Sequence, residues 1–231
     1  MLNPEEWQAV RLTLLVSTTA VLASLPLAIL LGWLLAKRNF AGKFLVETAV
    51  NLPLVLPPVV TGYLLLVAFG RNGPLGAILE NTFGVRLIFD WKGAALAAAV
   101  VSFPLLVRPI RLAFASIDDR LIQAARTLGA GPFDAFWTIM LPLARPGILS
   151  GCALALARSM GEFGATIMIA GNIPGQTRTI SLEIYNLLES PGGAREARTL
   201  VIVSVLIAAI AMMVGEILQR RGEKRLSTGG P

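Results

Sequence analysis

Five stretches of this chain are each long and apolar enough to cross a lipid bilayer, and they constrain its fold more than any other feature. A transmembrane helix needs about 20 mainly apolar residues. The candidate spans are residues 12–36, 45–69, 93–115, 147–169 and 199–218. Hydrophobic residues make up 55% of the 231 residues, and the mean hydropathy is +0.71, well above that of a soluble domain. The sequence predicts an all-α membrane protein with a single transmembrane domain over residues 1–231.

Positive charges are distributed unevenly among the connectors. Lys and Arg strongly outnumber Asp and Glu in 37–43, 108–145 and 220–225, whereas the two signs balance in the other connectors. Because basic connectors stay in the cytoplasm, we expect a periplasmic N-terminus, a cytoplasmic C-terminus and a cytoplasmic loop over residues 116–146. The net charge of +6 is spread over these connectors and forms no basic aqueous face, which argues against nucleic acid as a partner.

The residue types present exclude several kinds of chemistry. The chain has no His and one Cys, Cys152, so it lacks the residues of Ser-His-Asp or Cys-His catalysis and of common zinc sites. It also lacks the G-x-x-x-x-G-K-[ST] motif with which an ATPase binds phosphates. We therefore expect no catalytic, metal or cofactor site in this chain, and any ATP that drives it should be bound by another polypeptide.

The cytoplasmic loop is expected to contain two short helices. Ser116 is placed to cap the first helix and Gly129 to end it in a left-handed conformation. Pro132 suits the first turn of the second helix, and Leu141-Pro142 is expected to end it. Each helix has one apolar stripe. The stripes are Leu121, Ala124, Ala125 and Leu128, then Phe133, Phe136, Trp137, Met140 and Leu141.

The pattern alone leaves two interpretations of these stripes. Both helices could pack against the inner ends of the membrane helices, as most amphipathic stripes do. Alternatively, the small alanine stripe could let the first helix enter a groove on a second protein.

The same loop resembles a known motif. Gln123-Ala124-Ala125, three residues, Gly129, nine residues and then Ile139-Met140-Leu141-Pro142 are similar to the EAA loop of permease subunits of binding-protein-dependent ABC importers. In that family the loop docks into the ATPase subunit, and Gln123 replaces the Glu of many members. The residues that the resemblance implies in ATPase coupling are Gln123, Ala124, Ala125, Gly129, Ile139, Leu141 and Pro142.

Three further stretches narrow the resemblance. LPLVLPPVVTGYLLLVAFGRNG (52–73), ARSMGEFGAT (157–166) and NIPGQTRTI (172–180) resemble the molybdate permeases of the molybdate/sulfate group. The resemblance implies a type I ABC importer permease fold, in a subunit of the bacterial inner membrane that translocates molybdate or a related tetrahedral oxyanion such as tungstate or sulfate. It also implies four kinds of partner: a second copy of the chain, two ATPase subunits, a periplasmic oxyanion-binding protein and membrane lipid.

Arg158 and Glu162 lie in the middle of the fourth predicted span, one helical turn apart. An ionised residue at the bilayer centre costs about 2.5 to 3.5 kcal/mol on insertion scales, so the pair should face the bundle interior or a water-filled path. Two roles remain open: the pair could line or brace the anion pathway, or it could be an ion pair that only locks neighbouring helices together.

Other candidates for the pathway are polar or helix-breaking. Pro57 and Pro58 interrupt the second span just before Thr61. The resulting bend either forms part of a gate or is a packing feature. Thr166 could offer a passing oxyanion a neutral hydroxyl donor. Arg178, in the outer connector, either contacts a binding protein or is solvated.

Two other classes of protein fit the composition less well. A secondary transporter or channel would normally have ion-coupling acids or an inverted repeat, and neither is evident beyond Glu162. An intramembrane enzyme would need a nucleophile with a base, or a metal site. A chain with no His and one Cys supplies neither convincingly.

Overall fold

The computed structural model describes the backbone of residues 3–227 and the side chains of residues 3–217, and this part of the chain is helical with no strand. The predicted membrane orientation rests partly on the cations in 220–225. The side chains of these residues lie outside the described part of the chain. The elements are α1 (Pro4–Lys37), α2 (Lys43–Val55), α3 (Pro58–Phe69), α4 (Pro74–Phe83), α5 (Trp91–Ala115), α6 (Asp119–Thr127), α7 (Pro132–Ala135), the π-helical turn η1 (Phe136–Met140), α8 (Leu141–Met160), α9 (Gly164–Ala170), α10 (Ile180–Glu189) and α11 (Ala194–Ser227).

Several of these helices are suited to cross a membrane. Four described helices are long and apolar enough: α1, α5, the continuous helix Pro132–Met160, and Ala194–Ile217 within α11. The helices α2 and α3 qualify only as a pair, and the chain bends by 117° between them. The predicted interruption at Pro57 and Pro58 is therefore confirmed, since α2 ends at Val55 and α3 begins at Pro58. Counting the bent pair as one span gives up to five spans.

The fourth predicted span, 147–169, is wrong at both ends. The helix begins at Pro132 and runs without interruption through Pro142, which was expected to end it. The preceding turn is π-helical, with Leu141 N–H donating to Phe136 O five residues back, and this wider turn accommodates the proline ring. At its other end the helix stops at Met160, before the carboxylate of Glu162 accepts a hydrogen bond from Ala165 N–H and starts α9.

The expected cap of the first loop helix is also wrong. Ser116 ends α5, with its hydroxyl donating to Ala113 O. Asp118 caps α6 instead, accepting from Arg120 N–H. The reason is that Ser116 is the C-cap residue of α5 and keeps a helical backbone, whereas Asp118 has the extended backbone that an N-cap residue needs. The connector between α9 and α11 contains the short helix α10.

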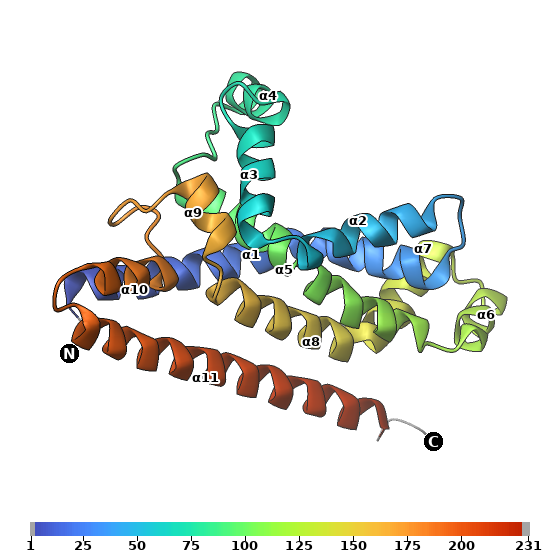
Figure 1. Ribbon diagram of the computed structural model, residues 1–231. Coiled ribbons are helices and arrows are strands. Elements are labelled where there is room, and N and C mark those ends of the chain that lie inside the picture. Colours follow the sequence, from blue (N-terminus) through green and yellow to red (C-terminus); the bar gives the residue numbers. More distant parts are fainter. Residues whose placement is uncertain (1–2, 228–231) are drawn as a thin grey trace.

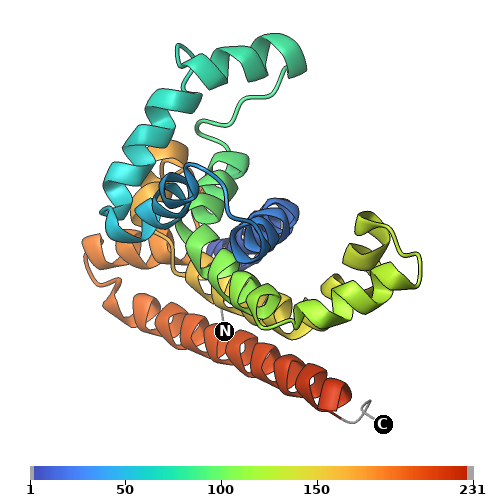
Figure 2. The same ribbon diagram turned by 90° about the vertical axis from the view of Figure 1, so that its right-hand side faces the viewer.

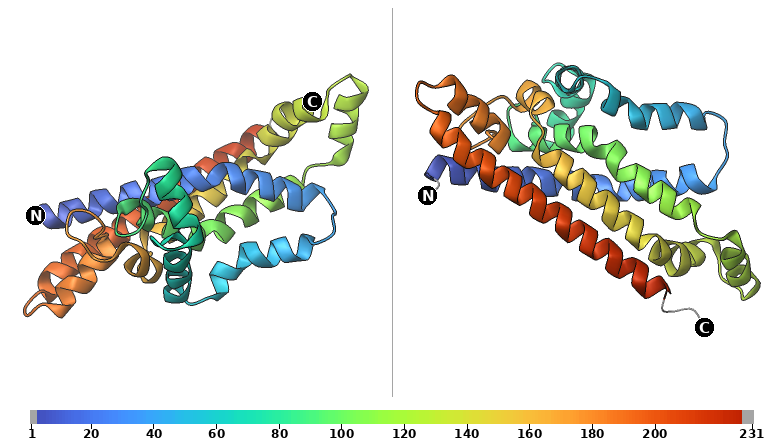
Figure 3. Two further views of the ribbon diagram at one scale, coloured as in Figure 1. Left: turned by 90° about the horizontal axis from the view of Figure 1, so that it is seen from above. Right: turned by 60° about the horizontal axis from the view of Figure 1, so that its bottom comes forward.

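The helix α5 is the centre of the bundle, with α1 and α8 packed against it (Figure 1). Small residues allow this close packing. A Cβ placed on Gly32 of α1 would lie 2.6 Å from Ile110 Cγ2, and the alanines at 94, 97 and 98 of α5 are buried. The helix α11 lies on the outside along α8 (Figure 3). Only 11% of its most apolar stretch is buried inside the protein. Its apolar surface is therefore available to lipid.

Two parts of the chain stand away from this bundle. The arm formed by α3 and α4 projects from its middle, and α6 with α7 projects from the end where α1 finishes (Figures 1 and 2). The start of α1, α10 and the start of α11 gather at the opposite end (Figure 1). The loop that resembles a docking motif thus projects from one end of the bundle.

Candidate functional site

The projecting segment of residues 118–142, here called the coupling segment, begins with a well-defined helix. Asp118 caps the start of α6, and Gly129 ends it with φ of +94°. Ala130 N–H then donates to Ala125 O at 3.0 Å, which is the hydrogen bond of a Schellman motif. The predicted left-handed stop at Gly129 is therefore present, and α6 has fixed ends although it projects from the bundle.

No residue of α6 is buried, which argues against the first interpretation of its stripe, while docking to a second protein stays a prediction. Leu121 is 49% exposed, Leu128 is 89% exposed, and Ala124 is exposed between them. Ile122, on a neighbouring face, packs against the core, and Ala125 is half-buried. The stripe of α6 therefore does not pack against the membrane helices and is free to contact another molecule. Gln123 is also exposed.

The second half of the segment has both an inner and an outer face. Phe136 packs its ring on Trp33 at 5.8 Å and on Phe114 at 6.1 Å between centroids. Phe133 and Trp137 contact each other and are 76% and 52% exposed. The predicted stripe therefore does not lie on one side of the helix. Phe136 anchors the helix to the bundle, whereas Phe133 and Trp137 face solvent. The remaining motif residues, Ile139, Leu141 and Pro142, are half-buried beneath.

A second candidate site lies where two helices are broken side by side. The chain breaks before α3 and again before α9, and these two helices pack closely together. A Cβ on Gly62 would lie 2.7 Å from the Ala165 Cα, and one on Gly164 would lie 2.9 Å from Pro58 Cβ. The structure therefore brings the predicted break in the second span next to one that the sequence did not reveal.

Polar groups gather at this junction. Arg158 Nη1 lies 2.8 Å from Glu162 Oε2, and Glu162 Oε1 accepts from Ala165 N–H at 2.9 Å. The Glu162 side chain is 2% exposed, whereas that of Arg158 is 31% exposed. One oxygen of Glu162 is thus paired with Arg158 and the other accepts from the start of α9, while the Arg158 side chain stays partly exposed.

Three buried hydroxyls lie on the helices that meet here. Thr61 on α3, Ser159 on α8 and Thr166 on α9 are all at most 4% exposed. Among the described residues, Thr61 Oγ1 and Ser159 Oγ have no hydrogen-bond partner. Leaving a buried hydroxyl unpaired is costly, so the contacts described within this chain do not account for the burial of these two groups. Pro57 and Pro58 are exposed at the edge of the junction.

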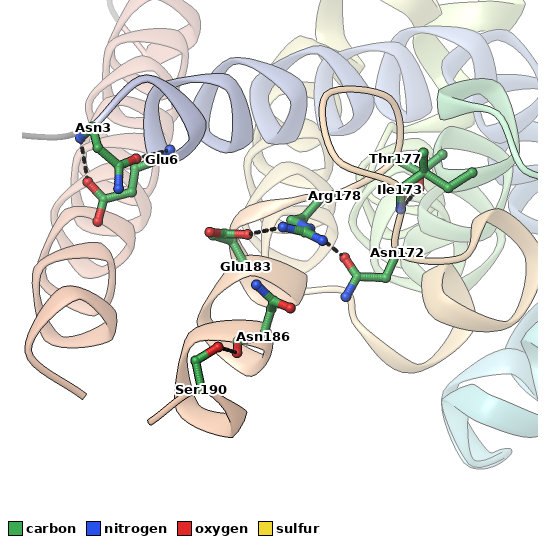
Figure 4. Close-up of polar contacts among 9 residues, drawn as sticks. All are labelled: Asn3, Glu6, Asn172, Ile173, Thr177, Arg178, Glu183, Asn186 and Ser190. Carbon is green, nitrogen blue, oxygen red and sulfur yellow. Dashed lines mark hydrogen bonds and ion pairs between the residues drawn. The ribbon is translucent and has the colours of Figure 1, made fainter. Parts of the chain in front are cut away.

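The outer connector holds Arg178 in a different way from either expectation (Figure 4). Its Nε donates to Asn172 Oδ1 at 2.8 Å, and its Nη1 lies 3.1 Å from Glu183 Oε2. The Arg178 side chain is 15% exposed and that of Glu183 is 2% exposed. Thr177 Oγ1 accepts from Ile173 N–H within the same loop. Arg178 is therefore an internal brace of this loop, neither a solvated charge nor a free contact.

Sequence reasoning missed the side chains that attach these parts to α1. Lys37 Nζ lies 2.6 Å from Asp119 Oδ1 and donates to Ile117 O at 2.7 Å. Thr13 Oγ1 accepts from Ile180 N–H, the first of α10. The sequence shows only that Trp33 and Lys37 lie one helical turn apart and that Thr13 is a hydroxyl within an apolar span. Neither feature identifies a partner that is distant in the sequence.

Several helices are long and apolar enough to cross a membrane, and buried polar side chains lie beside the helix breaks, as expected of a membrane transport protein. The family described as "Binding-protein-dependent transport system inner membrane component" matches residues 28–228, and the chain belongs to this family. The earlier resemblance to permease subunits is thereby confirmed.

Individual relatives agree with this assignment. The chain is 54% identical over 225 residues to the molybdenum transport system permease protein ModB of Escherichia coli (strain K12), covering 97% of this chain and 98% of that protein. It is 50% identical over 224 residues to ModB of Haemophilus influenzae, again covering 97% and 98%. Among solved structures, a bacterial ABC transporter that imports alginate matches with a TM-score of 0.73 and 21% identity over 95% of this chain and 80% of that one. This last similarity establishes the fold.

Proposed function

We propose that this chain is the membrane-spanning subunit of an ABC importer that moves molybdate, or a related tetrahedral oxyanion, across the bacterial inner membrane. The observation that carries the transport mechanism is the coupling segment, whose first helix has an exposed apolar stripe and no buried residue. The observation that favours molybdate is 54% identity, over nearly the whole chain, with a molybdenum transport permease.

In this proposal α6 docks into a groove on a separate ATPase subunit. Leu121, Ala124 and Leu128 would enter the groove, with the exposed rings of Phe133 and Trp137 beside them. Ala125 and Gly129 allow close approach, Gln123 supplies a neutral polar contact, and Ile139, Leu141 and Pro142 hold the base of the segment. The partner would bind and hydrolyse ATP, since this sequence has no phosphate-binding loop of that kind, and this chain would hold no cofactor.

The assembly would contain two copies of this chain related by a two-fold axis, two ATPase subunits and a periplasmic oxyanion-binding protein. A homodimer places the same surface of each copy at one interface. The coupling-segment end of the bundle would face the cytoplasm, because Lys37, Arg120 and Arg126 gather there and basic connectors stay inside. The N-terminus would then be periplasmic and the C-terminus cytoplasmic.

The junction of broken helices would form the gate of the anion pathway. Arg158 is the cation there, and its partly exposed guanidinium would attract the oxyanion without trapping it, because Glu162 neutralises its charge. Thr61 and Thr166 would supply neutral hydroxyl donors. The breaks at Pro57, Pro58 and Gly161–Phe163 would let α3 and α9 change direction when the ATPase subunits close, as a two-state rearrangement.

The docking proposal is tested with the complete complex, co-expressed with its ATPase. Leu128→Glu adds a carboxylate at the C-cap residue of α6, whose side chain is 89% exposed, so little packing is lost. Thr127→Glu adds the same charge to the adjacent polar face and serves as the control. We expect Leu128→Glu to abolish co-purification of the ATPase and Thr127→Glu to keep it. Equal ATPase recovery with both variants would mean that α6 is not the docking helix.

The choice of substrate and the rival class are tested by uptake. Proteoliposomes that contain the complex, ATP inside and binding protein outside should accumulate radioactive molybdate, and excess molybdate should compete better than excess sulfate. A secondary transporter or channel, the alternative function, would give uptake that does not depend on the ATPase. Sulfate competing as well as molybdate would broaden the substrate class to tetrahedral oxyanions.

A further inference from the structure

Two side chains in the last turn of α1 hold the coupling segment at separate points. Trp33 contacts the ring of Phe136 in η1. Lys37, one helical turn later and on the same face, pairs with Asp119 at the start of α6 and donates to the carbonyl of Ile117. The Lys37 side chain is only 14% exposed, so its charge depends on these two partners. The end of α1 thus holds both halves of the segment.

Near its other end, α1 holds the outer helix α10. Thr13 Oγ1 accepts from Ile180 N–H at 2.8 Å and donates to Ala9 O at 2.8 Å, and Thr13 is 3% exposed. Thr179, the N-cap residue of α10, makes no capping hydrogen bond with its own side chain. The first N–H of α10 is therefore capped by a residue of α1 that lies 167 positions away in the sequence.

One continuous helix joins these two attachment points. The helix α1 has 34 residues, which corresponds to a length of about 50 Å at 1.5 Å per residue. It packs closely along α5, where a Cβ on Gly32 would lie 2.6 Å from Ile110 Cγ2. Figure 1 shows α1 extending from the end that holds α10 toward the end that holds α6.

We infer that α1 is the element that transmits motion between the ATPase side and the outer side of the protein, with Lys37 and Thr13 as its positioning residues. This inference rests on the proposed docking of an ATPase to the coupling segment. When that segment moves, the Lys37 ion pair and the Trp33 ring contact move α1 with it. The Thr13 hydrogen bond then carries the displacement to α10, which leads into α11 on the outer side.

The test compares two lysines in the assembled complex. Lys37→Met removes the charge that binds the coupling segment but keeps the length and apolar stem of the side chain. Lys43→Met is the matched control, because among the described residues the Lys43 side chain bonds to the connector just before it, at Arg38 O and Asn39 Oδ1. We expect Lys37→Met to keep ATPase association and basal ATP hydrolysis, but to reduce stimulation by loaded binding protein by about fivefold or more, the lower end of usual coupling between distant sites. Lys43→Met should retain full stimulation.

Two rescues separate transmission from simple folding. Lys37→Arg should restore stimulation, and so should the exchange Lys37→Asp with Asp119→Lys, because each rebuilds the ion pair. At the outer end, Thr13→Val removes the hydroxyl with little change of shape and should also reduce stimulation. Ser17→Ala is its control, since the Ser17 hydroxyl bonds only within α1.

The outcomes distinguish this inference from the proposed function. Full stimulation in Lys37→Met would overturn the inference, and so would loss of ATPase association that neither rescue restores. A wild-type complex that binds no ATPase would instead overturn the docking proposal itself.

Discussion

Gly62 of α3 lies so close to Ala165 of α9 that a Cβ on the glycine would stand 2.7 Å from both the Cα and the carbonyl oxygen of the alanine. Atoms of real side chains do not approach backbone atoms this closely, so only glycine fits at this contact. The two short helices are thereby packed backbone to backbone at the point where both of their spans are broken. A movement of one helix must therefore be shared by the other.

The closeness of this contact predicts a large effect from one methyl group. Gly62→Ala should destabilise the protein by about 1 to 3 kcal/mol, as overpacking does in tightly packed interiors. Gly161→Ala is the control, because a Cβ there meets no atom within 4 Å and the glycine has a negative φ. Thermal unfolding in detergent gives both values. Equal stability of the two variants would contradict the close packing of α3 on α9.

Two aromatic residues of the coupling segment should have opposite roles. Phe136→Ala removes a ring held between Trp33 and Phe114 and should destabilise the protein by about 3 kcal/mol. Phe133→Ala removes a ring that is 76% exposed, so it should change stability by less than about 0.5 kcal/mol while weakening ATPase association. Melting temperature and ATPase co-purification, measured on the same preparations, check both effects. A large loss of stability in Phe133→Ala would mean that its ring belongs to the folded core.

The ion pair at the junction should be asymmetric. Arg158→Met leaves the Glu162 carboxylate buried without its cation and should cost about 3 kcal/mol of stability. Glu162→Gln keeps an oxygen that can accept from Ala165 N–H and should cost only about 1 kcal/mol. The double variant should be more stable than Arg158→Met alone, since it buries no unpaired charge.

Transport by the same variants tests the proposed gate. If Arg158→Met retains normal anion uptake and normal coupling to ATP hydrolysis, the pair is an ordinary structural ion pair and Arg158 has no role in the pathway. Loss of uptake in Glu162→Gln, with a loss of stability no larger than the expected ~1 kcal/mol, would support the proposed role of the pair in bracing the gate.

One pH effect is expected at α10. The Tyr185 hydroxyl donates to Glu189, and this hydrogen bond together with the negative charge of the carboxylate raises the pKa of Tyr185 above its ordinary value of about 10. The resulting stabilisation is present below that ordinary value and is lost as the pH rises through the higher value in the folded protein.

Ultraviolet titration measures this shift directly. The chain has two tyrosines, so a Tyr63→Phe background leaves Tyr185 as the only signal. Adding Glu189→Gln should lower the titration midpoint toward 10. An unchanged midpoint would show that the hydrogen bond to Glu189 does not persist in solution.

Much of this architecture follows from local sequence. The long apolar stretches predict roughly where the long helices lie, and the paired prolines predict the bend after α2. Gly129 predicts the end of α6, because glycine readily adopts the left-handed conformation found there. These features depend on residues that are neighbours in the chain. The exposure of the α6 stripe could not be predicted in the same way, because an amphipathic pattern does not say which molecule covers it.

The missed features depend on residues that are distant in sequence or on backbone geometry that several residues create together. Pro142 was expected to end a helix, but a π-helical turn absorbs its ring. The stretch around Glu162 looks helical, yet it breaks because Glu162 caps a new helix that packs on α3. The pairing of Lys37 with Asp119 spans 82 positions and has no periodic signal.

The bend between α2 and α3 also has a consequence for how the protein is made. These helices have 13 and 12 residues, and each falls short of the roughly 20 residues that cross a bilayer. Neither can leave the translocation channel for lipid as an independent segment. Their stable placement requires the surfaces of α5 and α9, which the ribosome produces later. We therefore expect α2 and α3 to reach their final positions only after α5 and α9 have been synthesised.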